Sequence, residues 1–176
     1  MSKEEILWIL RDYLRCSGCR RCEIACSFHH EDKIWPEASR IRVFMLVPGV
    51  EIPHLCAQCH DYPCVPSCPV NALSVSNETG AILVDKEKCI SCGKCIDACP
   101  GNIPFLHPSD NKAVICDLCG GDPECVKVCQ EAKFNALLAV RGGRENINRK
   151  LFAQTPEELT EDVAVNLYGE KAEELL

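Results

Sequence analysis

The sequence lacks three features that mark common classes of protein. No apolar run approaches the roughly 18 residues that a membrane-spanning helix needs, since such runs are short, as at 6–10 and 81–84. Lys and Arg number 19 against 26 Asp and Glu, and the net charge of −7 argues against nucleic-acid binding, because phosphate contacts need clustered basic side chains. Glu4 and Glu5 stand where a secretory signal would carry basic residues, so we expect a cytoplasmic protein with no direct membrane span.

The sequence also lacks a recognisable catalytic constellation. It contains no Walker loop and no dinucleotide-binding glycine pattern, and the pairs at 120–121 and 142–143 are typical of turns. None of the five histidines is needed as a metal ligand, although His60 lies between two cysteines and could tune a metal centre. We therefore expect no catalytic residues and no enzyme activity in this chain.

Ordinary apolar residues are scarce as well. Without its 16 cysteines, about 9% of the chain, the hydrophobic fraction falls from 47% to about 38%. That fraction is thin for a chain of 176 residues. Something besides apolar burial must hold the chain together.

The cysteines fall into four groups of four, and no cysteine lies outside a group. The groups are Cys16, Cys19, Cys22 and Cys26; Cys56, Cys59, Cys64 and Cys68; Cys89, Cys92, Cys95 and Cys99; and Cys116, Cys119, Cys125 and Cys129. Groups one and three have the spacing C-x2-C-x2-C-x3-C, whereas groups two and four lengthen the middle gap to four and five residues. This internal repeat is the strongest signal in the sequence.

Three chemistries could use so many thiols. Disulfides belong to oxidising compartments, and thiols three residues apart would bridge locally instead of joining distant segments. Structural zinc usually takes two separated pairs of ligands, whereas this spacing concentrates three or four thiolates in one tight segment. The bacterial iron–sulfur run has this spacing: its first three cysteines wrap one 4Fe–4S cluster and its fourth ligates the other cluster of a pair. The spacing therefore predicts 4Fe–4S ligation.

The number of cysteines predicts four clusters that act only as electron carriers. Four thiolates for each cluster use all 16 cysteines, with none missing and none spare. A catalytic cluster would leave one iron without a protein ligand, and no group lacks a cysteine. Each cluster also joins remote segments by metal–ligand bonds, which supplies the missing core. Lys94, Lys112, Lys127 and Lys133 could offset the negative charge of the clusters.

Hydrophobic patterning predicts a few short elements around the cysteine groups. Residues 3–15 read as a strand or, less readily, a helix, and 40–44 alternate like a half-buried strand. Residues 72–76 and 81–85 predict a hairpin that turns at 77–80. A helix or a strand is expected within 132–140, after the last group. The fold class expected is α+β, with two interleaved bacterial-ferredoxin-like modules and a C-terminal helical tail.

The last segment, 155–176, has a different composition. It holds seven acidic residues against Lys171, so most of the net charge lies there. Thr155 is placed to cap a helix, with Pro156 at its first position and Glu158 three residues after the cap. The segment is either a solvated terminal helix or a docking helix for a partner.

The residue after each fourth cysteine gives a hint about which groups share clusters. Pro69 and Pro100 follow groups two and three, whereas Ser27 and Gln130 follow groups one and four. This difference suggests nested pairing, in which group two pairs with three and group one with four.

Several segments resemble a known family. Residues 16–31 (CSGCRRCEIACSFHHE), 55–59 (LCAQC) with 63–69 (PCVPSCP), and 116–119 (CDLC) with 124–129 (ECVKVC) are similar to the four-cluster iron–sulfur subunits of the dimethyl-sulfoxide-reductase type. The likeness covers about residues 5–140. The compact length resembles most the small subunit of tungsten-containing aldehyde oxidoreductases. Gln130 and the acidic tail depart from the family pattern.

The resemblance implies a domain organisation and a ligand set for each cluster. Residues 1–140 would form the four-cluster domain, with module A from motifs 16–26 and 116–129, module B from motifs 56–68 and 89–99, and 141–176 as the acidic tail. The implied ligand sets are Cys16, Cys19, Cys22 with Cys129; Cys116, Cys119, Cys125 with Cys26; Cys56, Cys59, Cys64 with Cys99; and Cys89, Cys92, Cys95 with Cys68.

The resemblance also implies a function. The chain would relay electrons between a larger catalytic subunit, which holds a tungsten or molybdenum pterin, and a soluble acceptor such as ferredoxin. The alternatives are an electron-transfer subunit of a hydrogenase or formate dehydrogenase, and a free-standing polyferredoxin. All of them carry electrons through the clusters, and they differ in the partner.

Overall fold

The computed structural model describes residues 5–143 and 147–176, and its regular elements are short. The strands are β1 (Glu5–Arg11), β2 (Ile41–Val47), β3 (Val50–Leu55), β4 (Leu73–Val75), β5 (Ile82–Val84), β6 (Phe105–Leu106), β7 (Ala113–Val114) and β8 (Leu137–Gly143). The α-helices are α1 (Arg21–Glu31), α2 (Lys94–Asp97), α3 (Glu124–Glu131) and α4 (Pro156–Tyr168), with short 3-10 helices between them. The expected α+β class, with a C-terminal helix, is confirmed. Within these residues, no helix has the length and apolarity required to cross a membrane.

The strands pair as antiparallel two-stranded sheets. In the described residues β1 pairs with β8, β2 with β3, β4 with β5, and β6 with β7. The β1–β8 sheet places Trp8 opposite Val140. It therefore joins the segment before the first cysteine group to the segment after the last one. The strand expected in 3–15 is confirmed, and of the two alternatives for 132–140 the strand is right.

The hairpin expected after the second cysteine group is also confirmed. Leu73 of β4 lies opposite Val84 of β5, and Gly80 in the turn has a φ of +74°. A Cβ at Gly80 would lie 2.8 Å from the Cβ of Ile6, which is closer than side chains pack. Glycine is therefore required at this position both by its backbone conformation and by the close approach of β1.

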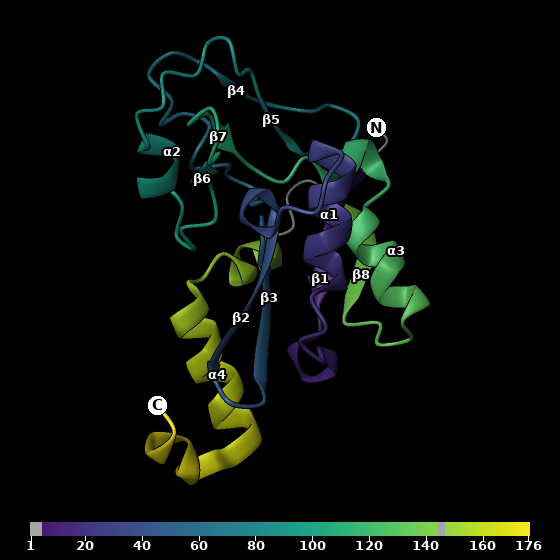
Figure 1. The fold of residues 1–176 in the computed structure, drawn as a ribbon. Coiled ribbons are helices and arrows are strands. Elements are labelled where there is room, and N and C mark those ends of the chain that lie inside the picture. The colour runs from purple at the N-terminus through teal and green to yellow at the C-terminus, as the bar shows by residue number, and fades with distance from the viewer. Residues whose placement is uncertain (1–4, 144–146) are drawn as a thin grey trace.

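The molecule divides into a body and an arm (Figure 1). On one side of the body, α1 and α3 lie next to each other and to the β1–β8 sheet. On the other side of the body lie α2, the β4–β5 hairpin and the β6–β7 hairpin. The arm is the outer part of the β2–β3 hairpin with α4 and the 3-10 helix Gly169–Glu174 packed along it. The body core contains many cysteines beside residues such as Leu55 and Leu118.

The arm has an apolar core of its own, without cysteine. Leu159, Val163 and Ala164 of α4 pack on Val47, Val50 and Ile52 of the hairpin, together with Ala172. Helix α4 begins as expected, since the Thr155 hydroxyl accepts a hydrogen bond from the Glu158 N–H and the Glu158 carboxylate accepts one from the Thr155 N–H. The expectation of a wholly solvated terminal helix is wrong for this face, because its apolar residues recur at helical spacing and meet the hairpin.

Candidate metal centres

Cysteine groups one and three each lie on a tight loop that leads into a helix. Gly18 and Arg20 in group one, and Ser91 and Gly93 in group three, have positive φ angles. These left-handed residues turn the chain around a common centre and then start α1 and α2. The last cysteine of each of these groups stands four residues after the third, about one helical turn further along the axis, and therefore points to another centre.

The structure brings the sixteen thiols together as four quartets, each built from two groups. Quartet 1 is Cys16, Cys19, Cys22 and Cys129; quartet 2 is Cys26, Cys116, Cys119 and Cys125; quartet 3 is Cys56, Cys59, Cys64 and Cys99; quartet 4 is Cys68, Cys89, Cys92 and Cys95. Quartets 1, 2 and 4 each line a small cavity. The members of each quartet are those that the family resemblance implies.

Quartet 3 is recognised by the electrostatic influence of its thiols on one another. Burial, followed by the negative charges of Cys99 and Cys59, raises the pKa of Cys64 to about 12. Burial and the charge of Cys99 also raise the pKa of Cys59. Cys99 comes from group three and the others from group two, so this centre joins two loops that are distant in the sequence.

Electrostatic effects between thiols also indicate which quartets are neighbours. Cys125 of quartet 2 has its pKa raised by burial and by nearby thiolates that include Cys22 of quartet 1. Cys56 of quartet 3 has its pKa raised by burial and then by Cys116 of quartet 2. Cys64 of quartet 3 has Cys95 of quartet 4 among the charges that act on it. The quartets therefore follow one another as 1, 2, 3 and 4 across the body.

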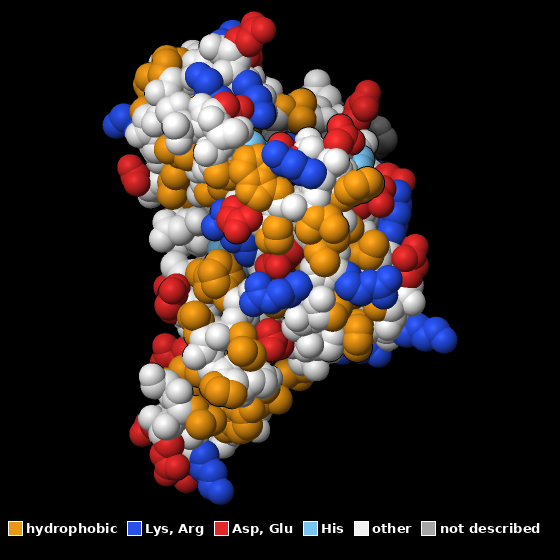
Figure 2. Space-filling view, in the orientation of Figure 1, with side chains coloured by type: hydrophobic (Ala, Val, Ile, Leu, Met, Phe, Trp, Pro, Cys, Tyr) orange, Lys and Arg blue, Asp and Glu red, His pale blue; other side chains and the backbone are white. Residues whose placement is uncertain are grey.

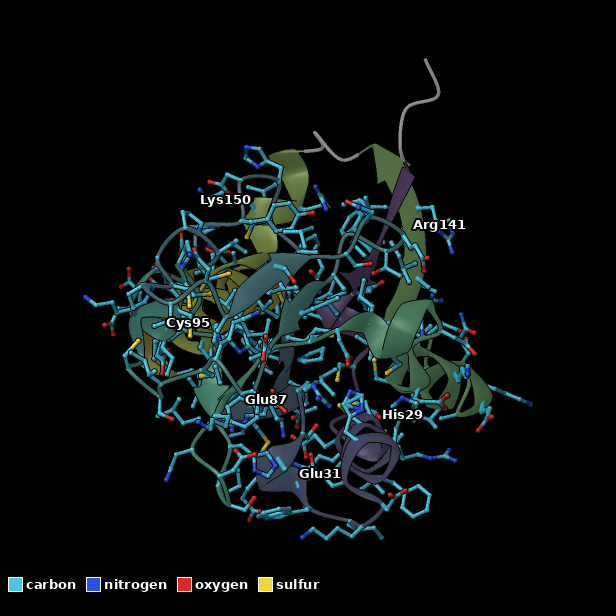
Figure 3. The ribbon with its side chains drawn as sticks, turned by 90° about the horizontal axis from the view of Figure 1, so that it is seen from above. His29, Glu31, Glu87, Cys95, Arg141 and Lys150 are labelled. Atoms are coloured by element: carbon cyan, nitrogen blue, oxygen red, sulfur yellow. The ribbon has the colours of Figure 1, made fainter. Side chains whose placement is uncertain are left out.

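Exposure differs between the ends and the middle of this series. Eight cysteines are buried and two are exposed, namely Cys19 of quartet 1 and Cys92 of quartet 4. Figure 3 shows the two sides of the body, with Cys95 among the loops of one side and His29 on α1 at the other. The end quartets therefore reach the surface, whereas the middle quartets are enclosed.

The quartets fit iron–sulfur clusters in their donors and their surroundings. All sixteen cysteines are free thiols, and burial raises the pKa of Cys22 and Cys116 to about 12. Such thiols become thiolates when a metal binds and releases their protons. Backbone N–H groups already point at the sulfurs: those of Arg40 and Ala72 donate to Cys26 Sγ and Cys68 Sγ, both at 3.2 Å. N–H···S bonds of this kind are among the features that set cluster potentials.

The lysines that could offset cluster charge behave differently from one another. Lys112 Nζ donates to the carbonyl oxygen of Cys89 at 2.6 Å, so it lies beside quartet 4. Lys127 is paired with Asp122 and with Glu124 Oε1, the latter at 2.7 Å, so its charge is already balanced. Only the first of these two lysines is placed to act on a cluster.

Several polar side chains lie near the quartets but belong to no sequence motif, so the sequence alone did not indicate their position. Arg11 is buried and donates to the carbonyl oxygens of Leu55 and Cys56, both at 2.8 Å, and to that of Phe152 at 3.0 Å. Gln58 is fully buried between quartets 2 and 3, and its Nε2 donates to the carbonyl oxygen of Cys116 at 2.9 Å. The one available sequence signal for Arg11 was its position directly after the apolar run at 6–10.

Histidine also lies closer to a quartet than the sequence indicated. Ligand atoms of His29, His30 and Cys119 lie within 4.8 Å of one another. His30 Nε2 lies 3.1 Å from Asp117 Oδ1, and the same carboxylate oxygen accepts a hydrogen bond from the Cys119 N–H at 3.0 Å. These histidines flank quartet 2, whereas the sequence had singled out His60.

Comparisons with known proteins identify iron–sulfur families and relatives of this chain. Residues 49–137 match the family described as the 4Fe-4S dicluster domain, and residues 13–28 match a 4Fe-4S binding domain. The aliphatic sulfonate oxidoreductase, polyferredoxin-like subunit, of Pyrococcus furiosus is 54% identical over 172 residues, which cover 97% of this chain and 99% of that protein. The thiosulfate reductase electron transfer subunit PhsB of Salmonella typhi is 35% identical over 138 residues, which cover 69% of this chain and 70% of that subunit.

A solved structure is similar over a comparable length. A chain of the active site complex BamBC of benzoyl coenzyme A reductase covers 97% of this chain and 95% of its own length, with a TM-score of 0.47 and 22% identity. The family match covers half of the chain, and the two relatives are electron-transfer subunits. This protein therefore belongs to the 4Fe–4S dicluster family, among the non-catalytic electron-transfer subunits of oxidoreductases, and it carries four 4Fe–4S clusters.

Proposed function

We propose that the chain conducts electrons through its four clusters in the order of quartets 1, 2, 3 and 4, for a tungsten or molybdenum pterin oxidoreductase. The observation that carries the proposal is the single series of quartets, each of which acts electrostatically on the next. An electron can then move in short steps between clusters. A larger catalytic subunit would carry out the reaction, and a ferredoxin or a similar soluble protein would exchange the electrons.

In this proposal each quartet ligates one cluster. Module A, from motifs 16–26 and 116–129, holds the clusters of quartets 1 and 2, and module B, from motifs 56–68 and 89–99, holds those of quartets 3 and 4. The exposed thiols Cys19 and Cys92 belong to the two end quartets, so electrons enter at one end of the series and leave at the other. The many free thiols suit a reducing compartment such as the cytoplasm.

Two catalytic partners are supported by different observations. The 54% identical relative is described as a subunit of an aliphatic sulfonate oxidoreductase and matches this chain over nearly its whole length, which favours a sulfonate-oxidising partner. The compact spacing of the motifs favours a tungsten-containing aldehyde oxidoreductase. Hydrogenase and formate dehydrogenase partners, or a free-standing carrier, would use the same clusters but have less support from relatives of this length.

The arm is the proposed docking element for the catalytic partner. Its apolar core is closed between α4 and the hairpin, yet Met45 and Leu46 of β2 are 54% and 49% exposed, and Leu167 and Tyr168 of α4 are also exposed. Figure 2 shows hydrophobic side chains gathered on the arm, with acidic side chains near them. A partner surface that is apolar in its centre and basic at its rim would complement this element.

Purification from the source organism under anaerobic conditions tests the proposal. We expect a stoichiometric larger subunit that contains tungsten or molybdenum, identified by mass spectrometry and elemental analysis. Reduction of the iron–sulfur chromophore by an aliphatic sulfonate, and not by an aldehyde, would select the sulfonate-oxidising partner. Isolation of the chain as a monomer with all its clusters would favour the free-standing polyferredoxin and contradict the subunit role.

A further inference from the structure

Arg40 is a half-buried cation beside quartet 2. It directly precedes β2, and its backbone N–H donates to Cys26 Sγ at 3.2 Å. The residue lines the cavity of quartet 2 together with Cys26, Cys116, Cys119 and Cys125, and it also lines an open cleft. Arg40 therefore borders the quartet 2 centre directly.

The guanidinium of Arg40 lacks partners within the described part of the chain. Its Nε and Nη1 atoms are buried and form no hydrogen bond there, and no carboxylate of those residues forms an ion pair with it. The carboxylate of Asp117, on the same cavity wall, already interacts with His30 and with the Cys119 N–H. Buried guanidinium nitrogens without a partner are costly, and an anion near Arg40 would satisfy them.

Two other arginines nearby differ from Arg40, because their guanidinium groups form hydrogen bonds. The guanidinium of Arg11 donates to three carbonyl oxygens, although its Nε also lacks a partner. Arg42, two residues after Arg40, donates to the carbonyl oxygen of Glu37 and lies 4.2 Å from the centroid of the Phe105 ring. It lines an open cleft that Arg40 also lines, but it does not line the cavity of quartet 2. Of these three arginines, Arg40 is the one whose guanidinium forms no hydrogen bond within the described residues.

The anion that fits is the cluster itself. A 4Fe–4S cluster with four thiolates carries about −2 when oxidised and about −3 after it accepts one electron. A fixed positive charge beside it stabilises the second state more than the first. This attraction is strong in a buried site, because the effective dielectric constant is far below that of water.

We propose that Arg40 is the built-in counter-ion of the quartet 2 cluster and raises its reduction potential. The proposal rests on the ligation of a cluster by quartet 2. Arg40 acts through charge and hydrogen bonding, without ligating iron, so it is a tuning residue and not a catalytic one. In the step that it favours, one electron passes from a neighbouring cluster to the quartet 2 cluster, and no bond is formed or broken.

The test is a redox titration of the anaerobically purified full chain, followed by electron paramagnetic resonance. Arg40→Gln removes the charge and keeps hydrogen-bonding capacity, Arg40→Lys keeps the charge, and Arg42→Gln removes an equal charge two residues away. A Cys119→Ser variant, which changes a ligand of this cluster, identifies its signal. At the wild-type midpoint potential, we expect Arg40→Gln to lower the ratio of reduced to oxidised quartet 2 cluster about tenfold or more, equivalent to about 59 mV for one electron.

The matched variants separate this proposal from its alternatives. We expect Arg40→Lys to retain most of the wild-type potential and Arg42→Gln to leave it unchanged. Loss of one cluster from Arg40→Gln but not from Arg40→Lys would also support the counter-ion role. An unchanged potential in Arg40→Gln with full iron content, an equal shift in Arg42→Gln, or loss of iron from both Arg40 variants would overturn it. A wild-type chain without four clusters would instead overturn the proposed function.

Discussion

The body and the arm of this protein are stabilised by different kinds of chemistry. The body core combines seven buried cysteines with aliphatic residues such as Leu55 and Leu118. The arm core contains no cysteine and consists of aliphatic and aromatic residues, most of them from α4 and the β2–β3 hairpin. The comparison teaches that apolar burial explains the arm, whereas the body requires metal–ligand bonds to fix its loops.

A second contrast lies within the body. Quartets 2 and 3 contain six of the eight buried cysteines, and both exposed cysteines belong to quartets 1 and 4. Water screens the charge of an enclosed cluster poorly, so fixed polar groups near it have a larger effect on that charge. Charge on an end cluster is partly solvated, and such a cluster can exchange electrons with another protein.

Removal of iron should give the largest difference between body and arm. When the anaerobic protein is oxidised and treated with an iron chelator, we expect amides of α1, α3 and β8 to lose hydrogen-exchange protection before those of α4. The reason is that the body loses its cross-links, while the apolar contacts of the arm are not altered directly. Mass spectrometry with hydrogen exchange measures both regions together. Earlier loss of protection in α4 than in α1, α3 and β8 would contradict this prediction, because it would show that the arm depends on the clusters more than the body does.

Loss of an inner ligand should be more damaging than loss of an end ligand. Cys116→Ala removes a buried ligand of quartet 2, and Cys92→Ala removes an exposed ligand of quartet 4. Each variant should fall from about sixteen iron atoms per chain to about twelve. We expect the apparent Tm of Cys116→Ala to fall further, because its cluster cross-links the centre of the body. Similar decreases in Tm would mean that the enclosed centre does not contribute more to stability than the end does.

Arg11 provides a test of the body that leaves the thiols in place. Arg11→Met removes the donor for three carbonyl oxygens, two of them in buried hydrogen bonds. It should cost about 2–6 kcal/mol, since each unsatisfied buried group costs about 1–3 kcal/mol. For a chain of this size, the apparent Tm should then fall by about 4–24 °C. Arg15→Met is the control, because Arg15 is more than half exposed and its contact with Asp12 is 4.0 Å long. A comparable decrease in Tm for the control would contradict a specific role of Arg11.

An apolar truncation in the arm should weaken the arm without affecting the clusters. Leu159 is buried against the hairpin, whereas Leu167 is 46% exposed. Leu159→Ala should cost the arm about 2–5 kcal/mol, seen as faster hydrogen exchange in α4, and Leu167→Ala should cost much less. The paramagnetic resonance signals should stay unchanged in both variants. A changed cluster spectrum in Leu159→Ala would show that body and arm are not independent.

The smallest expected effect is that of the α4 cap. Thr155→Ala removes the hydroxyl of the capping box and should cost about 1 kcal/mol. Thr155→Ser keeps the acceptor and should restore most of the stability. Exchange of the first amides of α4 provides the measurement, and equal exchange in the Ala and Ser variants would mean that the hydroxyl contributes nothing.

The sequence was most informative where local chemistry fixes the structure. The cysteine spacing indicated the cluster type, alternation indicated β2 and the β4–β5 hairpin, and Thr155 with Pro156 indicated the start of α4. These signals are short in range, so they do not depend on the rest of the fold. The membership of the quartets could be stated beforehand only through the resemblance, because it joins loops up to 113 residues apart, as with Cys16 and Cys129.

Other features could not be predicted, because they arise from tertiary contacts. Nothing around Arg40 in the sequence indicates that its backbone N–H donates to Cys26 Sγ or that two of its guanidinium nitrogens are buried. Arg11 meets its acceptors only when β1, β3 and the segment around Phe152 come together. The buried face of α4 depends likewise on the position of the hairpin. Polar residues that act on a metal centre through space leave no spacing pattern along the chain.

The central claim is that the sixteen cysteines hold four cubane clusters in series. Chemical determination of iron and acid-labile sulfide in the anaerobically purified chain tests it most directly. The account predicts about sixteen of each per chain, with no stoichiometric zinc. A zinc-loaded chain, or one with iron for two clusters or fewer, would contradict it.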